Sequence, residues 1–379
     1  LDNTNANGQA WEFKSTNGAS SSTGTLQLKD EDGHFWMAFN ENAGSNFIQF
    51  LTNNTEALKI DASGNIIIAN TGGTLQTATA GTSNLRLGQN AGDSIASGGN
   101  YNVLVGLNAG TAITTGDQNT AVGGTALAAN ISSSYNTAIG QESMASTTGA
   151  SNTAVGDKSM LDNVGGANNV AVGASALENN TTASNNTAVG YQAGYTNTTG
   201  VNLSAFGHGS LRGNTTGYNN SALGVSALYT NTSGINNTAS GQSSLTSNTT
   251  GSYNTAVGMS ALTANTTASS NTAVGYQAAY TNTTGAENVA VGNKSLYTNT
   301  TGTGNVAVGH YALNENSTAA YNTGVGYLAL RRNTTGASNV ALGYASLTAN
   351  TTASNNTAVG YQAGYANTTG TANVAVGTK

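Results

Sequence analysis

The chain has 379 residues, 50 of them glycine, and only 7% are charged, with no proline and no cysteine. Without cysteine, disulfides and thiolate metal sites are excluded, and a net charge of −6 with one adjacent basic pair, Arg331-Arg332, argues against a nucleic-acid partner. No apolar run reaches the roughly 18 residues that a membrane-spanning helix needs.

Residues 1–80 differ in composition from the rest and are predicted to form a small N-terminal β module. Eleven charged residues, both tryptophans and five of the six phenylalanines lie before residue 62. Apolar runs at 24–29 and 34–39, and at 57–60 and 65–68, flank short glycine-containing segments, which predicts two β-hairpins. The first of these segments, Asp30-Glu-Asp-Gly33, has oxygen ligands for calcium but lacks the rest of an EF-hand, which favours a plain turn.

The remainder of the chain is a repeat. Seventeen glycines from Gly106 to Gly377 recur every 17 residues, with one step of 16 between Gly140 and Gly156, and each closes a variant of Asn-Thr-Ala-Val-Gly. A period this short suits one turn of a β-solenoid. We predict an all-β fold: a parallel β-solenoid (β-roll) of about 17 coils over residues 101–379, with residues 81–100 as a cap or transition. At about 4.8 Å per coil the rod would be roughly 80 Å long.

Positions in a coil are numbered from this glycine, which is position 0. Position −1 is Val, Ile, Leu or Phe in 16 of the 17 coils, position −3 is mostly Thr or Val, and Leu or Met recurs at +4. Alternation along a strand places −1 and −3 on one face and −2 on the other. We predict two short strands per coil, with −1, −3 and +4 in a thin interior that leaves a single roll marginally stable.

Two columns of asparagine and one of alanine run along the repeat. Asparagine occupies −4 in 16 of 17 coils and +7 without a break from Asn163 to Asn367, and such columns can form amide ladders between coils. Alanine at −2, found in 15 of 17 coils, fits either a second interior layer or a subunit interface along the rod. The asparagines taken as ladder members are Asn119, Asn136, Asn186, Asn254, Asn271 and Asn356.

The coil motifs Asn-Thr-Ala-Val-Gly and Asn-Val-Ala-Val-Gly resemble the Asn-Ser-Val-Ala-Ile-Gly motif of trimeric autotransporter adhesin heads, which are parallel β-rolls assembled as trimers. The coils here are longer, 17 rather than about 14 residues. Coils with Asn-Thr-Thr-Gly after a module containing Glu56-Ala-Leu-Lys-Ile-Asp also resemble bacteriophage tail fibre and tailspike proteins. Both resemblances imply a homotrimeric fibre, and the phage resemblance is preferred because it covers both segments.

Chemistry-bearing residues are sparse, so we predict no enzymatic activity, no cofactor and no metal site. The three histidines, His34, His208 and His310, lie far apart, the last two taken to be at unrelated coil positions. Asn-x-Thr sequons recur through the coils and would accept glycans in a secretory pathway, although the turn alone accounts for them. They include Asn197, Asn214, Asn248, Asn282, Asn333 and Asn367.

Tyrosines recur at +1 and +5. Facing outward, their flat apolar rings suit sugar rings, and stacked on one another they would instead form a ladder that stiffens the rod. The candidate glycan-contact residues are Tyr191, Tyr195, Tyr276, Tyr280, Tyr361 and Tyr365.

We therefore expect a structural or adhesive fibre, a phage tail fibre segment that positions or provides recognition of a host-surface glycan or receptor. It would lie on a virion or a cell surface, contact other virion or filament subunits, bind no nucleic acid and insert into no membrane. The alternatives are a bacterial surface adhesin or self-assembling extracellular filament, and an ice-binding protein. Ice binding is disfavoured because the coils have no Thr-x-Thr for a flat face, and their paired threonines are adjacent and expected in a turn.

Overall fold

The computed structural model describes residues 81–379 in full and the backbone of six strands between residues 12 and 67. The chain divides into two compact units, residues 1–77 and 78–379. The predicted turns at 30–33 and 61–64, and His34, lie outside the described residues.

The first unit contains a six-stranded antiparallel sheet in which each strand pairs with the next along the chain. β2 pairs with β3 and β5 pairs with β6, which are the pairings of the two hairpins expected from the sequence. The strands are β1 (Glu12–Ser15), β2 (Gly24–Lys29), β3 (Phe35–Glu41), β4 (Phe47–Thr52), β5 (Thr55–Ile60) and β6 (Ile66–Ile67).

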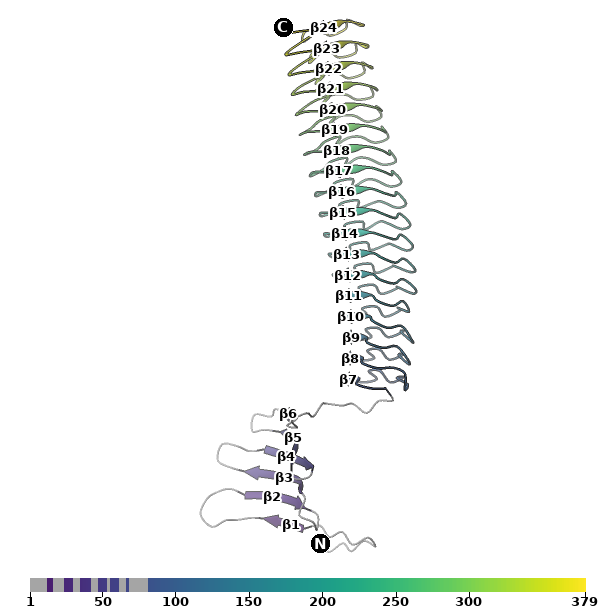
Figure 1. Cartoon of the computed structure of the whole chain (residues 1–379), viewed down its shortest axis with the longest axis vertical. Coiled ribbons are helices and arrows are strands. Elements are labelled where there is room, and N and C mark those ends of the chain that lie inside the picture. Colours follow the sequence, from purple (N-terminus) through teal and green to yellow (C-terminus); the bar gives the residue numbers. More distant parts are fainter. Residues whose placement is uncertain are drawn as a thin grey trace. The chain divides into compact units, whose positions relative to one another are not determined.

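The second unit is a parallel β-solenoid with one three-residue strand per coil, which confirms the predicted fold class (Figure 1). Consecutive strands pair in parallel and in register, so that Ala256 lies beside Ala273 of the next coil. The ladder begins at β7 (Leu85–Leu87), within the segment predicted as a cap. Its other strands are β8 (Val103–Val105), β9 (Thr120–Val122), β10 (Thr137–Ile139), β11 (Thr153–Val155), β12 (Val170–Val172), β13 (Thr187–Val189), β14 (Ser204–Phe206), β15 (Ser221–Leu223), β16 (Thr238–Ser240), β17 (Thr255–Val257), β18 (Thr272–Val274), β19 (Val289–Val291), β20 (Val306–Val308), β21 (Thr323–Val325), β22 (Val340–Leu342), β23 (Thr357–Val359) and β24 (Val374–Val376).

The interior of the coil is not the one predicted. Alanine at −2 points inward and is fully buried, as Ala256 is, whereas positions −3 and −1 point out of the coil. The prediction of two strands per coil, with −1 and −3 inside, was therefore wrong, and so was the reading of the alanine column as a subunit interface. Position +4 was placed correctly, since Leu262 is fully buried, and the alternative interpretation of the alanine column, a second interior layer, is confirmed. Most of the buried side chains are small, which suits a narrow coil. The buried residues of one coil are Asn254, Ala256, Ala261, Leu262, Asn265 and Ala268.

The coil bends at its grid glycine because only glycine tolerates the local backbone. Gly258 has φ of +128°, and a Cβ added to it would lie 2.5 Å from the carbonyl oxygen of Gly275 in the next coil. L-residues rarely adopt such a φ, and the neighbouring backbone leaves no room for a side chain. The invariance of this position along the repeat follows from both constraints.

Buried amides join successive coils as two ladders. In the +7 column, Asn265 Nδ2 donates to Asn248 Oδ1 at 2.8 Å and to the carbonyl oxygen of Ala268 at 3.0 Å. In the −4 column, Asn254 Oδ1 accepts the backbone N–H of Asn271 at 3.0 Å, and Asn254 Nδ2 donates to that same Ala268 oxygen at 2.8 Å. The asparagines therefore satisfy buried backbone groups that the short strands leave unpaired.

Each ladder has a break that the sequence explains. Leu203 replaces asparagine in the −4 column; its own N–H still donates to Asn186 Oδ1, but it has no side-chain oxygen for the N–H of Asn220. In the 16-residue coil, buried Thr147 occupies the +7 place, and its hydroxyl has no hydrogen-bond partner. At both places the coil lacks a hydrogen bond that asparagine makes in other coils.

Candidate functional surfaces

One flat face of the roll is formed by the outward side chains of β8–β24, and we call it the strand face. It carries a column of Thr, Val and Ser at −3 and a column that is mainly Val at −1. Val172, Val257 and Val274 are 37–38% exposed. Apolar side chains lined up over this length are typical of a surface that another molecule covers.

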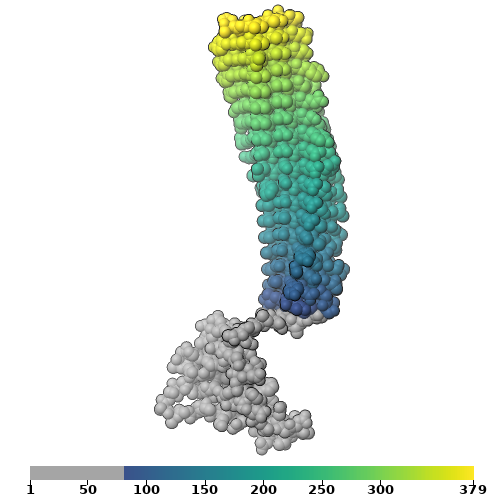
Figure 2. Space-filling model, viewed as in Figure 1, coloured from purple at the N-terminus to yellow at the C-terminus, as the bar shows by residue number. Residues whose placement is uncertain are grey.

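The strand face carries no charge. Among residues 101–379, every Asp, Glu, Lys and Arg lies in the segments between strands. The two ion pairs recorded among these residues also belong to those segments: Lys158 with Glu142 at 3.7 Å, and Arg331 with Glu315 at 4.0 Å. Charge is therefore kept to the flanks of the rod, whose side chains repeat coil by coil along its length (Figure 2).

The regularity of the strand face is interrupted at β14–β16. Phe206, the only aromatic residue on this face, is 39% exposed, and Leu223 in the next coil is 58% exposed. Beside them the face has a shallow, almost wholly apolar hollow of about 380 Å³, which extends over Ser204, Ser221 and Ser240. Two protruding side chains and an adjacent depression thus lie on three successive strands.

Aromatic residues form stacks along two other columns. At +1, His310, Tyr327, Tyr344 and Tyr361 stack in series with ring centroids 5.1–5.3 Å apart. At +5, Tyr280 and Tyr297 stack at 5.3 Å. Stacked rings cover each other's faces, so an approaching ligand meets their edges, except at the end of a stack.

The other candidate tyrosines lie in different surroundings. Tyr191 is 49% exposed and stacks on His208 at 5.3 Å, while Tyr276 is 40% exposed. The guanidinium of Arg212 lies 5.4 Å from the Tyr195 ring, and the Lys379 ammonium lies 5.0 Å from the Tyr365 ring. The six candidates therefore do not form one cluster; each belongs to its own stretch of a column.

The structure corrects the prediction that His208 and His310 lie at unrelated coil positions. His208 and His310 both occupy position +1 and are ring partners in the aromatic column, rather than being at unrelated coil positions. Sequence inspection could have found this, since each follows its grid glycine directly.

The sequon asparagines of the +7 column face the interior. Asn197, Asn214 and Asn248 are fully buried, and each Nδ2 donates to the asparagine of the preceding coil at 2.8 Å. Attachment of a glycan to such a nitrogen would remove the ladder, so these sequons are structural in the folded roll.

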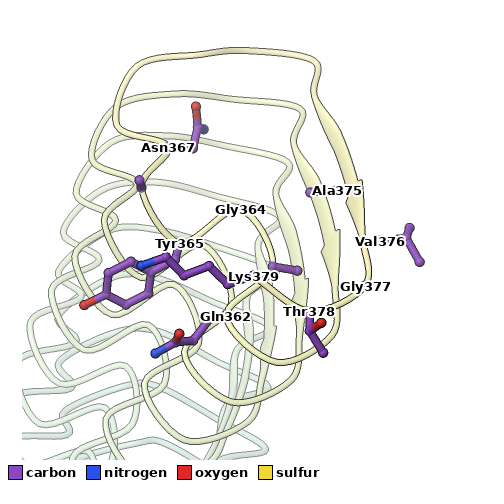
Figure 3. Close-up of a pocket in the computed structure, with 11 residues that line it drawn as sticks. Gln362, Gly364, Tyr365, Asn367, Ala375, Val376, Gly377, Thr378 and Lys379 are labelled. Carbon is purple, nitrogen blue, oxygen red and sulfur yellow. The ribbon is translucent and has the colours of Figure 1, made fainter.

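A second concavity, also of about 380 Å³, lies at β24 in the last coil (Figure 3). Its lining is the inward-facing surface of that coil, with Gly364, Ala375 and Asn367 among the lining residues. In the other coils, the residues at the corresponding positions are covered by the next coil. The lining also includes Gln362, Tyr365, Thr378 and Lys379, and the Lys379 ammonium lies over the Tyr365 ring.

Within residues 81–379 and the described strands before them, no three His, Cys, Asp or Glu side chains come together as a metal site would require. The same described residues include no helix with the length and apolar character of a membrane span. No protein-family model, curated protein or solved structure matches the chain.

Proposed function

We propose that the chain is a segment of a structural or adhesive fibre with no enzymatic activity. The observation that carries the proposal is the unbroken parallel ladder from β7 to β24, closed internally by amide columns, with one uncharged apolar face along its length. A ladder of 18 strands at about 4.8 Å per step spans about 82 Å. Such a rod can hold two ends apart and present a repeated surface.

The strand face supports self-association. A rod with a core built mainly of Ala, Leu and Asn buries little apolar area per coil, and covering the outward valines with further copies would add to it. We propose a homotrimer in which the strand faces of the copies meet. The proposed interface is therefore formed by the −3 and −1 columns, and not by the −2 alanine column that the sequence also allowed.

The setting we propose is outside the cell, on a virion as part of a tail fibre, or on a cell surface as an adhesin or filament. The support is the resemblance of the coil motif to phage fibres and adhesin heads, together with the rod itself. Contact with a host glycan would fall on the exposed tyrosines of the +1 column, such as Tyr191, Tyr276 and Tyr361. Repetition along and around the rod would raise the avidity of weak single contacts.

Electron microscopy and glycan binding test this proposal together. The full chain should give straight rods of uniform width, and binding to envelope polysaccharide of the host should fall when Tyr191, Tyr276 and Tyr361 are changed to alanine. A matched change of Tyr297, a half-buried tyrosine of the +5 column that stacks on Tyr280, should leave binding intact. Collapsed or irregular particles would contradict the structural role. Rods that bind no glycan would support a role as a spacer and contradict the adhesive role.

Ice binding is a second candidate, because one column of threonines faces outward on the strand face, although these strands read Thr-Ala-Val rather than Thr-x-Thr and the adjacent Thr249 and Thr250 lie between strands as expected. Thr255 and Thr272 face outward at −3 on a flat sheet, in register with the valines at −1, rather than lying in a turn. A crystal lattice, however, matches an uninterrupted plane, and Phe206 and Leu223 protrude from this one. Absence of thermal hysteresis in the full chain would dismiss this candidate.

A further inference from the structure

The strand face poses a problem of register for any assembly of this chain. Its side chains repeat almost identically every coil, so two copies could slide past each other by one coil and meet nearly the same surface. Uniform repeats specify register weakly unless some position breaks the pattern. Ile139 and Leu342 are single departures at −1, whereas the three successive strands β14–β16 all depart from the pattern, with Phe206, Leu223 and Ser240 at −1.

We propose that Phe206 and Leu223 fix the register of a parallel assembly by entering the hollow over Ser204 and Ser221 of a second copy of this chain. The inference rests on the self-association proposed above and specifies how the copies meet. A rotation axis parallel to the rod keeps each coil level with the same coil of its partner. It also brings the −1 column of one copy against the −3 column of the other.

Size complementarity supports this pairing. Ser204 and Ser221 are the only serines in the −3 column, and they lie in the two coils whose −1 residues are Phe206 and Leu223. A large side chain of one copy therefore meets the smallest −3 side chain of the other. A slip of one coil in either direction places Phe206 or Leu223 against a threonine, Thr187 or Thr238.

The strand face is large enough to hold a second copy. A face of 17 strands, β8–β24, each about 10 Å wide and about 4.8 Å from the next, covers roughly 800 Å² per copy, which is the share of a stable standard interface. No charge on this face opposes burial. The occupant is therefore a surface like itself: flat, apolar and of the same repeat.

An exchange of volumes tests the proposal, with sedimentation over a dilution series as the measurement. Ser204→Phe fills the hollow and should weaken assembly about tenfold, as expected from one overpacked contact. Adding Phe206→Ser in the same chain exchanges the large and small residues across the coil and should restore assembly. Thr267→Phe, on an exposed turn away from the strand face, is the control and should change nothing.

An antiparallel assembly predicts a different rescue. A two-fold axis across the rod at Leu223 would place Phe206 against Ser240, so the pair Phe206→Ser and Ser240→Phe would assemble and the pair Ser204→Phe and Phe206→Ser would not. That result, or no effect of Ser204→Phe on an assembled wild type, overturns the register proposal while leaving self-association standing. A wild type that stays monomeric at all concentrations overturns both. Far-ultraviolet circular dichroism of each variant confirms that the roll is folded.

Discussion

Removing one buried amide from the middle of the +7 ladder should destabilise the roll far more than removing an exposed one. Asn265→Ala deletes two donated bonds, to Asn248 Oδ1 and the Ala268 carbonyl, and one accepted bond from Asn282 Nδ2 at 3.0 Å. The matched control is Asn293→Ala, the same change at an exposed position.

The magnitude follows from the groups left behind. A net hydrogen bond contributes about 1 kcal/mol, and a buried partner left unsatisfied costs about 1–3 kcal/mol. The Oδ1 of Asn248 loses its partner, and Asn282 Nδ2 loses one of its two acceptors but keeps its bond to the Gly285 carbonyl oxygen. The Ala268 oxygen keeps the bond from Asn254. Asn265→Ala should therefore lower the local free energy of unfolding by about 3–5 kcal/mol, against less than about 0.5 kcal/mol for the control.

Amide hydrogen exchange measures this effect coil by coil, which suits a repeat protein better than one global transition does. Protection should fall by at least about a hundredfold in the coils adjoining Asn265, since 1.4 kcal/mol corresponds to tenfold. Coils at the far ends of the roll should be unchanged. Equal protection in Asn265→Ala and Asn293→Ala would refute the claim that amide ladders bind the coils.

Other substitutions test single features of the coil. Thr147→Val should raise the free energy of unfolding by about 1 kcal/mol because it removes an unpaired buried hydroxyl. Leu203→Asn should raise it similarly by restoring the acceptor for the Asn220 N–H. A fall in melting temperature for either variant would contradict its explanation. Ala256→Val should destabilise its coil by about 1–3 kcal/mol through overpacking. If Val257→Ala destabilised a dilute monomer by a comparable amount, the assignment of −2 to the inside and −1 to the outside of the coil would be wrong. Gly258→Ala should cost at least about 3 kcal/mol, and an unperturbed melting curve would contradict the backbone geometry at the bend.

The sequence was sufficient for the period, the parallel stacking and the asparagine columns. These follow from spacing alone, because a 17-residue repeat with asparagine at fixed places can satisfy its backbone in few other ways. The face of the strand was not determined, since alternation over three residues is the same pattern with either face inward. Hydrophobicity favoured valine inside and was misleading, because position −2 of the narrow coil is occupied by alanine in 15 of 17 coils.

A better signal was present in the variability of each column. Position −3 accepts Thr, Val and Ser, as in Thr187, Val170 and Ser204, which a packed interior would not. Position −2 is alanine almost throughout, which a solvent-facing site would not require. The Phe206 hollow could not be predicted in this way, because its shape depends on which face is exposed.

Sedimentation of the full chain, with and without charge on the strand face, tests the central claim most directly. The wild type should have a mass that is a multiple of 37.7 kDa. Val189→Lys with Val274→Lys, which adds two charges to an uncharged apolar surface, should reduce that mass to the monomer while the circular dichroism of the roll is kept. A wild-type chain that sediments as a folded 37.7 kDa monomer, or lysine variants that assemble as before, would contradict the account.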